Sequence, residues 1–482
     1  MIRLRHALMA LGAVAALAVG AIPAQANEAV TYRSEMYVIR DPALAQNPDI
    51  VRVTLERDGN LDALGIQPSA AAGQAPSAAK PRIAAADPPY AVDSSRFPAG
   101  RKPADPYDYM NHANCLANAA TAGQDAGWIK NRFSYCQIDL VWAVDLKCGP
   151  RGCQVIGAIG ATSAVVGYGK IGSHPENATQ RFADFRLVTT IVYTKGVFDQ
   201  PNATMQATVR CAGEYRVGFG IPNDRACHPG KFETRKATIP QWRLDPNSYF
   251  DLLSDGYQPG AEFGEQLAQG VFKFEYEFTP KRDVDLKSVS PEGGLRFDSA
   301  FYLRDKQGSI FDRAVPGMAY RKSDAGVAGH AVHIDEARAN PDATVPTKQG
   351  KRLLGGSSAP GDSLHRLTSA RSEDSRARAE RNRTVSTNFC KTVKMPPKPP
   401  EGGPFDCDEY AFASSYEGSA RNEYDGAQYA LDYTVRWVNS DQNQEAGRRL
   451  FGWQENDRIL DLGRDQKLDP HDQERFYIPI NP

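Results

Sequence analysis

The sequence predicts an α+β protein, with a β-rich, sandwich-like domain followed by a smaller domain that mixes strands and helices. At 482 residues, the chain is too long for one ordinary core. Residues 107–287 contain apolar and aromatic runs separated by Gly- and Pro-containing turns, a pattern typical of strands. From residue 360 onward, charged helical patterns and strand-like runs alternate.

The N-terminus has the pattern of an export signal. "MIRLRH" is basic, "ALMALGAVAALAVGA" is apolar, and "AQA" at 24–26 is a small-x-small cleavage site before Asn27. A membrane anchor is the alternative, but the apolar run is short for a membrane span. We therefore expect a signal peptide at 1–26 and a secreted, extracellular protein that is free of the membrane after cleavage.

The cysteines agree with an exported protein. An even number of cysteines in such a chain suggests up to four disulfides. Spacing along the chain does not determine the connectivity, but pairing of neighbours suggests Cys115–Cys136, Cys148–Cys153, Cys211–Cys227 and Cys390–Cys407. The alternative is a thiolate zinc site, which needs tight CxxC spacing that the sequence lacks.

The middle of the chain divides by composition. We expect an N-terminal segment and an Ala/Pro-rich linker over 27–106, because "PSAAAGQAPSAAKPRIAAADPP" has too little apolar surface to order itself. A β-rich, disulfide-containing domain is predicted over 107–287, without a catalytic constellation. A loop-rich connection follows over 288–359, and a second domain over 360–482.

The most informative stretch is "CDEYAFASSYEG" at 407–418, which places Asp408 and Glu409 in an aromatic, strand-like run. A second strand is predicted over 427–438, and then a helix capped by Ser440. Buried carboxylates are costly unless they are compensated, and oxygen ligands suit a hard divalent cation. A surface carboxylate pair beside a disulfide is the alternative interpretation.

This stretch resembles the CDEYPFAST-x-EG signature of the NucA/NucB-type secreted deoxyribonucleases. The Arg-rich "LHRLTSARSEDSRARAERNR" before it and "SDQNQEAGRRLFGWQENDRILD" after it are similar to the family in the same order. The resemblance covers about 360–482. Two residues depart from the signature: Ala411 stands where the family usually has Pro, and Ser419 replaces a common second Gly.

The resemblance implies a small ββα-metal nuclease core that uses Mg²⁺ or Mn²⁺ and acts on DNA. It assigns catalytic roles to Asp408, Glu409 and Glu417, and metal ligation to Asp408, Asn443 and Glu445. Because adjacent strand residues face opposite ways, Asp408 and Glu409 are not expected to share one site unless the strand ends or bulges there. We therefore expect Asp408 to be the base or a metal partner, and Glu409 to take the other role or to bond to the Arg-rich helix.

The Arg-rich segment is a candidate phosphate track. Residues 362–394 hold eight basic residues against four acids, a local excess of +4 in a chain whose net charge is −1. With so small a net charge, the chain as a whole does not attract a polyanion, so DNA must be held by a local positive patch. Such a patch beside a nuclease centre suits non-specific DNA binding. We predict DNA-phosphate contacts by Arg366, Arg381 and Arg383, although a solvated helix face would show the same pattern.

The expected function is therefore that of a secreted, metal-dependent and largely sequence-nonspecific endodeoxyribonuclease. The alternative is a non-enzymatic exported binding protein with a degenerate nuclease module. In that case the β-rich region would bind a cell-surface or glycan ligand.

Overall fold

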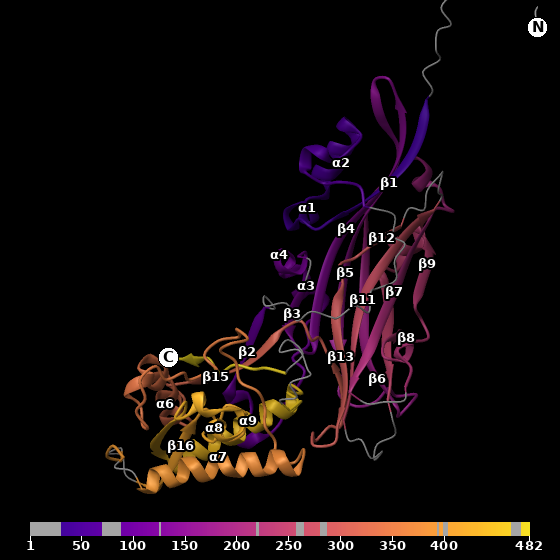
Figure 1. Ribbon diagram of the computed structural model, residues 1–482. Helices are drawn as coiled ribbons and strands as arrows, with labels where there is room; N and C mark the ends of the chain where they lie inside the picture. Colours follow the sequence, from indigo (N-terminus) through magenta and orange to yellow (C-terminus); the bar gives the residue numbers. More distant parts are fainter. Residues whose placement is uncertain are drawn as a thin grey trace, which may run out of the picture.

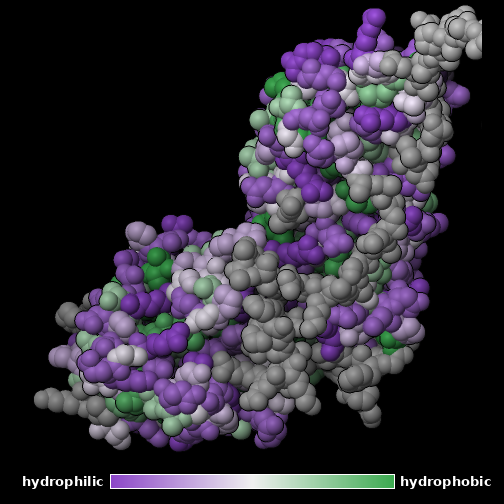
Figure 2. Space-filling model, turned by 45° about the horizontal axis from the view of Figure 1, so that its top comes forward, coloured by the Kyte–Doolittle hydropathy of each residue, from purple (hydrophilic) through white to green (hydrophobic). Residues whose placement is uncertain are grey.

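The computed structural model describes residues 30–69, 88–124, 127–217, 221–256, 265–279, 287–392, 395–398, 403–463 and 474–482. The predicted signal peptide at 1–26 lies outside these residues. Figure 1 shows an elongated body of strands with the orange-to-yellow C-terminal module at one end. On the face seen in Figure 2, hydrophobic residues occur in small groups among hydrophilic ones.

The first sheet is antiparallel, with the strand order β1-β4-β5-β6-β10-β8 and with β3 paired to β4. Its strands are β1 (Thr31–Ile39), β3 (Trp128–Asn131), β4 (Ser134–Gly149), β5 (Gly152–Gly169), β6 (Gln180–Lys195), β8 (His228–Pro229) and β10 (Asn247–Asp255).

The second sheet is also antiparallel, with the order β14-β13-β11-β7-β9 and with β12 paired to β11. Its strands are β7 (Thr204–Val217), β9 (Thr234–Thr238), β11 (Glu265–Thr279), β12 (Lys287–Val289), β13 (Gly293–Ala300) and β14 (Gln307–Ile310). One apolar cluster joins the two sheets and includes Phe185 and Phe250 from the first sheet and Phe272 and Phe274 from the second. Alternate residues of each strand therefore fill a shared core, as in a sandwich.

Short helices pack near the first sheet. Leu55 of α2 lies in a cluster with Trp142 of β4, and Cys115 of α3 lies in another with Ile138 of the same strand. These helices are α1 (Pro42–Gln46), α2 (Pro48–Asp58), α3 (His112–Ala117), α4 (Ala119–Ala122) and α5 (Ile239–Leu244).

The C-terminal module contains a small parallel sheet, in which β15 lies between β2 and β18. A second core, which includes Tyr320, Tyr410, Trp453 and Phe476, joins this sheet to the helices. The elements are β2 (Pro89–Asp93), β15 (Val315–Arg321), α6 (Ala328–Ala339), α7 (Glu373–Thr392), β16 (Phe405–Tyr410), α8 (Arg421–Asp425), β17 (Thr434–Asn439), α9 (Ser440–Asn456) and β18 (Ile480–Asn481).

The α+β class predicted from the sequence is confirmed, but two segments are more ordered than expected. Part of the predicted linker over 27–106 forms β2, and the predicted loop-rich connection over 288–359 contains β13, β14, β15 and α6. The pairing of β2 with β15 joins Pro89 to Val315. A local sequence pattern cannot show a partner so far along the chain. Because β13 and β14 belong to the second sheet, the β-rich region also continues past residue 287.

Four disulfides join Cys115 to Cys136, Cys148 to Cys153, Cys211 to Cys227 and Cys390 to Cys407. These are the pairs that spacing along the chain suggested, and they are consistent with an extracellular protein. Among the helices of the described residues, none has the length and apolar character needed to span a membrane.

Buried ion pairs connect the β-rich region to the C-terminal module. Asp298 on β13 accepts hydrogen bonds from Arg458 Nε at 2.9 Å and from Arg296 Nη2 at 3.1 Å. Glu474 forms ion pairs with Arg296 and with Arg132. Burial alone would raise the pKa of Asp298, but the guanidinium groups of Arg458 and Arg296 lower it below its usual value.

Removing Arg458 should destabilise the fold strongly. In Arg458→Ala, Asp298 loses one of its two guanidinium partners while it stays buried, so we expect the free energy of unfolding to fall by about 3–5 kcal/mol. Chemical denaturation measures this change. The control is Arg376→Ala, which removes an exposed pair with Glu373 and should leave the free energy of unfolding unchanged. An equal loss in both variants would contradict the role of Arg458.

The same carboxylate makes the free energy of unfolding depend on pH. Because the pKa of Asp298 is lower in the folded state, its ionised carboxylate stabilises the fold at pH values above the unfolded-state pKa of about 3.9. This stabilisation is lost as the pH falls through the folded-state pKa. We expect Asp298→Asn to lose less free energy of unfolding than the wild type between neutral pH and about pH 3. Denaturation curves across this range test this, and identical pH dependence in the two proteins would refute it.

Candidate active site

The candidate site lies on two antiparallel strands, β16 and β17, which α9 follows directly. Asp408 pairs with Arg436 in the register of the strands, and Glu409 pairs with Val435. Asn439, rather than the predicted Ser440, caps α9 by accepting a hydrogen bond from the Asp441 N–H at 3.0 Å. The predicted strand over 427–438 is shorter than expected, because β17 begins only at residue 434.

Asp408 is buried and is held by two histidines from α6. His330 Nδ1 lies 3.0 Å from both carboxylate oxygens, and His333 Nδ1 lies 2.7 Å from Oδ2. Burial alone would raise the pKa of Asp408, but the charge and hydrogen bonds of the two histidines lower it well below its usual range. Asp408 therefore stays ionised inside the module.

The two histidines were missed in the sequence analysis. They lie in "GHAVHID" at 329–335, within the segment predicted to be a loop-rich connection. A His-x-x-His spacing puts both side chains on one helix face, and this was the signal that could have identified them. Their partner, however, is 75 or more residues further along the chain, a distance that local pattern does not bridge.

Hydrogen-bonding rules fix which nitrogen of each histidine carries the proton. A carboxylate accepts only, so the Nδ1 atoms of His330 and His333 are the donors, and each Nε2 is an acceptor in the neutral ring. His330 Nε2 is buried and has no hydrogen-bond partner within the described residues. Its ring is stacked on Phe412, with centroids 5.9 Å apart, and meets Tyr320 edge to face.

His333 connects Asp408 to a cavity of about 660 Å³. Its Nε2 lies 3.3 Å from Thr434 Oγ1. Two cations, Lys398 and Arg436, line the same cavity, together with Trp437. An acid–histidine pair thus lies beside a space that offers positive charge and an aromatic face.

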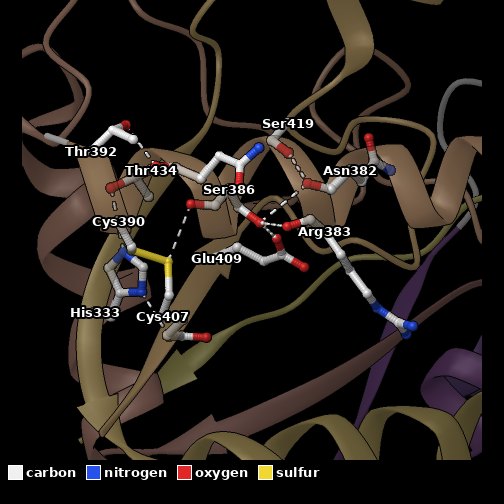
Figure 3. Close-up of a disulfide and its surroundings, with 12 residues drawn as sticks. His333, Asn382, Arg383, Ser386, Cys390, Thr392, Cys407, Glu409, Ser419 and Thr434 are labelled. Atoms are coloured by element: carbon white, nitrogen blue, oxygen red, sulfur yellow. Dashed lines mark hydrogen bonds and ion pairs between the residues drawn. A yellow bond between two sulfur atoms is a disulfide. The ribbon is translucent and has the colours of Figure 1, made fainter.

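Glu409 faces the other side of β16, as strand alternation predicted. It accepts a hydrogen bond from Ser386 of α7 and another from the Ala413 N–H at 3.0 Å. Figure 3 shows its carboxylate beside α7, near the backbone of Arg383, whose guanidinium points away. Burial, together with the charge of Asp408, raises the pKa of Glu409 to about 7.

The Cys390–Cys407 disulfide joins the end of α7 to β16. Figure 3 shows it beside Ser386, whose carbonyl oxygen lies 3.4 Å from Cys407 Sγ. Closing a loop of this length stabilises a fold by about 3 kcal/mol in the entropic account. The disulfide therefore fixes α7 against the strand that carries both acids.

Glu417 lies in a separate place and is paired with His365. The carboxylate accepts hydrogen bonds from the His365 N–H at 2.9 Å and from Nδ1 at 3.0 Å. This pair lines a second cavity of about 230 Å³, with Arg352 and Arg421. The described contacts do not join Glu417 to Asp408.

The predicted helix ligands lie in the first turns of α9. Asn443 is half-buried. The carboxylate of Glu445 accepts hydrogen bonds from Arg449 at 2.8 Å, from Arg448 at 3.0 Å and from the Ala99 N–H at 2.9 Å. Glu445 is therefore engaged by two arginines.

The predicted phosphate contacts fall into two groups. Arg366 is buried, donates to the Ile459 carbonyl at 2.7 Å and pairs with Glu455 at 2.5 Å, so its prediction as a DNA contact is wrong in this structure. Arg381 and Arg383 lie exposed on α7, and Arg381 is paired with Glu423 at 2.8 Å. The helix begins at Glu373, so Arg366 belongs to the chain before it.

Two of the three residues predicted to hold a metal, Asp408 and Glu445, have their carboxylates occupied by other side chains. Asp408 gives its oxygens to two histidines and Glu445 gives its oxygens to two arginines. Within the described part of the chain, no three His, Cys, Asp or Glu side chains are grouped so that they could hold a metal ion.

Two strands and a helix in this order, with a carboxylate on the first strand, match the class of ββα nuclease cores that the resemblance implied. Residues 359–460 match the family Deoxyribonuclease NucA/NucB, which shows a deoxyribonuclease domain in the C-terminal part of the chain. That domain implies deoxyribonuclease activity with DNA as the substrate. The curated proteins contain no match to this sequence.

The clamp on Asp408 can be tested by removing one histidine. His330→Phe keeps a ring between Tyr320 and Phe412 but removes a donor from a buried carboxylate, so we expect the free energy of unfolding to fall by about 1–3 kcal/mol. The loss should be smaller when Asp408→Asn is already present, because the amide carries no charge. Denaturation of the four proteins of this cycle measures the coupling, and additive losses would show that the pair does not interact.

Proposed function

We propose that residues 359–460, together with α6, form a secreted endodeoxyribonuclease that hydrolyses DNA phosphodiester bonds with little sequence specificity. The proposal rests on Asp408, an ionised carboxylate on the first strand of the matched domain, joined through His333 to a cavity. Four disulfides support secretion. Dependence on Mg²⁺ or Mn²⁺ is proposed from the family resemblance alone.

The side chains of this site suit the activation of water. A histidine whose Nδ1–H is held by a carboxylate can accept a proton at Nε2, and the ionised carboxylate stabilises the imidazolium that forms. His333 has this arrangement, and its Nε2 lies on the side of Thr434 and the cavity. In this proposal Asp408 positions His333, and His333 takes the proton from the attacking water.

The cavity suits a nucleic-acid backbone. Lys398 and Arg436 supply positive charge, and Arg436 is paired only with the exposed Glu336 among its described contacts. Lys398 lies over the ring of Trp437, 5.1 Å from its centroid. Contacts to phosphate position DNA without reading its sequence, which fits low specificity. Arg383, exposed on α7, is proposed as a further phosphate contact.

One observation favours the alternative of a degenerate nuclease module. Asp408 is 2% exposed and both of its oxygens are occupied, so α6 separates it from a substrate in this arrangement. If His333 does not accept a proton in place of the occluded Asp408, the module binds without cutting, and the β-rich region carries the function. A measurement of DNA cleavage therefore discriminates between a nuclease and a binding protein.

We expect Asp408→Asn and His333→Ala each to lower the rate of plasmid cleavage at least about 100-fold, because each removes half of the proton-accepting pair. The measurement is nicking of supercoiled plasmid by residues 27–482 with Mg²⁺, with Mn²⁺ and with EDTA.

The control is Asp374→Asn, an exposed carboxylate at the start of α7, which should leave cleavage unchanged. Cleavage lost in EDTA and restored by Mn²⁺ would support metal dependence. A wild-type protein that leaves the plasmid intact with every metal would refute the nuclease proposal and favour the binding protein.

A further inference from the structure

The β-rich region carries a cavity of about 820 Å³ on the first sheet. Its floor lies on three neighbouring strands, β5, β6 and β10. Tyr168 pairs with Asp184, and Asp184 pairs with Asp251, so these residues form one row across the sheet. Phe185 and Phe250, which are the sequence neighbours of Asp184 and Asp251, belong to the core between the sheets. The row therefore faces outward, away from the core.

Aromatic side chains line this cavity and stay open to solvent. Tyr249 is 66% exposed and Phe232 is 62% exposed, and both lie at the cavity with Tyr168 and Phe182. Large aromatic surfaces left in water are characteristic of binding sites. The rings offer flat faces on which an apolar face of a ligand can stack.

Two carboxylates lie directly opposite each other on the cavity floor. Asp184 and Asp251 are cross-strand partners, and like charges in that position destabilise a sheet. Lys170 pairs with Asp184 at 2.8 Å, whereas His174 Nε2 lies 3.7 Å from Asp251. Burial, with the charges of Asp184 and Glu176, raises the pKa of Asp251. The sheet thus retains an unfavourable pair that points into a cavity.

The charged side chains that line this cavity indicate the class of ligand that fits it. Three cationic side chains, Lys170, Arg186 and Lys231, are balanced by three anionic ones, Glu176, Asp184 and Asp251. A groove for single-stranded DNA would have a positive surplus around its aromatic rings. A balanced set of strong donors and acceptors suits a neutral ligand that is rich in hydroxyl groups, because hydroxyls both donate to carboxylates and accept from ammonium and guanidinium groups.

We propose that this cavity binds a neutral oligosaccharide. Tyr249 and Phe232 stack against the apolar faces of sugar rings, and Asp184 and Asp251 accept hydrogen bonds from sugar hydroxyls. Lys170 donates to the ring or hydroxyl oxygens. The site lies on a different part of the chain from Asp408, so it binds its ligand whether or not the C-terminal module cuts DNA.

Binding is tested with residues 27–482 by isothermal titration against chitotetraose, cellotetraose and maltotetraose at millimolar concentration, with a single-stranded oligothymidylate as the competing ligand. We expect saturable binding of at least one oligosaccharide, and Tyr249→Ala should weaken it roughly tenfold or more. The matched control is Leu244→Ala, a side chain 88% exposed and outside the cavity, which should bind as the wild type does.

Asp251→Asn gives a second measurement, since an amide keeps the shape of the site but loses the charged acceptor; weaker binding is expected. Plasmid cleavage by Tyr249→Ala should equal that of the wild type. Failure of all three oligosaccharides to bind, equal binding by wild type and Tyr249→Ala, or binding of the oligothymidylate at this site in their place would each overturn the proposal.

Discussion

One buried carboxylate, Asp298, holds the two parts of the molecule in register. It lies between Arg296 of its own strand and Arg458, which follows the C-terminal end of α9. A buried charge is costly unless its partner stays in place, so this contact favours one relative position of the two parts. An apolar cluster that includes Leu303 and Leu460 lies between the same two parts. Through Arg458 the constraint passes to α9, and through α9 to the strands that carry the acids. The nuclease domain is thereby fixed against the β-sandwich.

The alternation of β16 then divides an acidic pair into two different environments. Asp408 faces α6, where two histidines keep it charged, and Glu409 faces α7, where burial favours its protonated form. Neighbouring residues of the same chemical type thus have opposite pKa shifts because a strand has two faces. The disulfide at Cys407 secures one of these faces, and the packing of α6 secures the other.

Local reasoning from the sequence succeeded where a property depends on neighbours in the chain. Strand alternation separated Asp408 from Glu409, and short spacings suggested the disulfide pairs. It failed where a partner lies far away. Arg366 has the appearance of a phosphate contact in a basic run, but Glu455, 89 residues later, draws it into the interior. The histidines of α6 and the pairing of β2 were missed for the same reason, since only the folded chain brings their partners to them.

The small parallel sheet has a consequence for the timing of assembly. Its central strand, β15, has one neighbour near residue 90 and the other near residue 480. Phe476 and Ile478, which precede the late strand, belong to the same core as Tyr410 and Trp453. A ribosome delivers these pieces in order, so the module that holds Asp408 lacks part of its interior until synthesis has passed residue 480. Assembly of the C-terminal module is thus delayed relative to the sandwich, whose strands have all been made by residue 310.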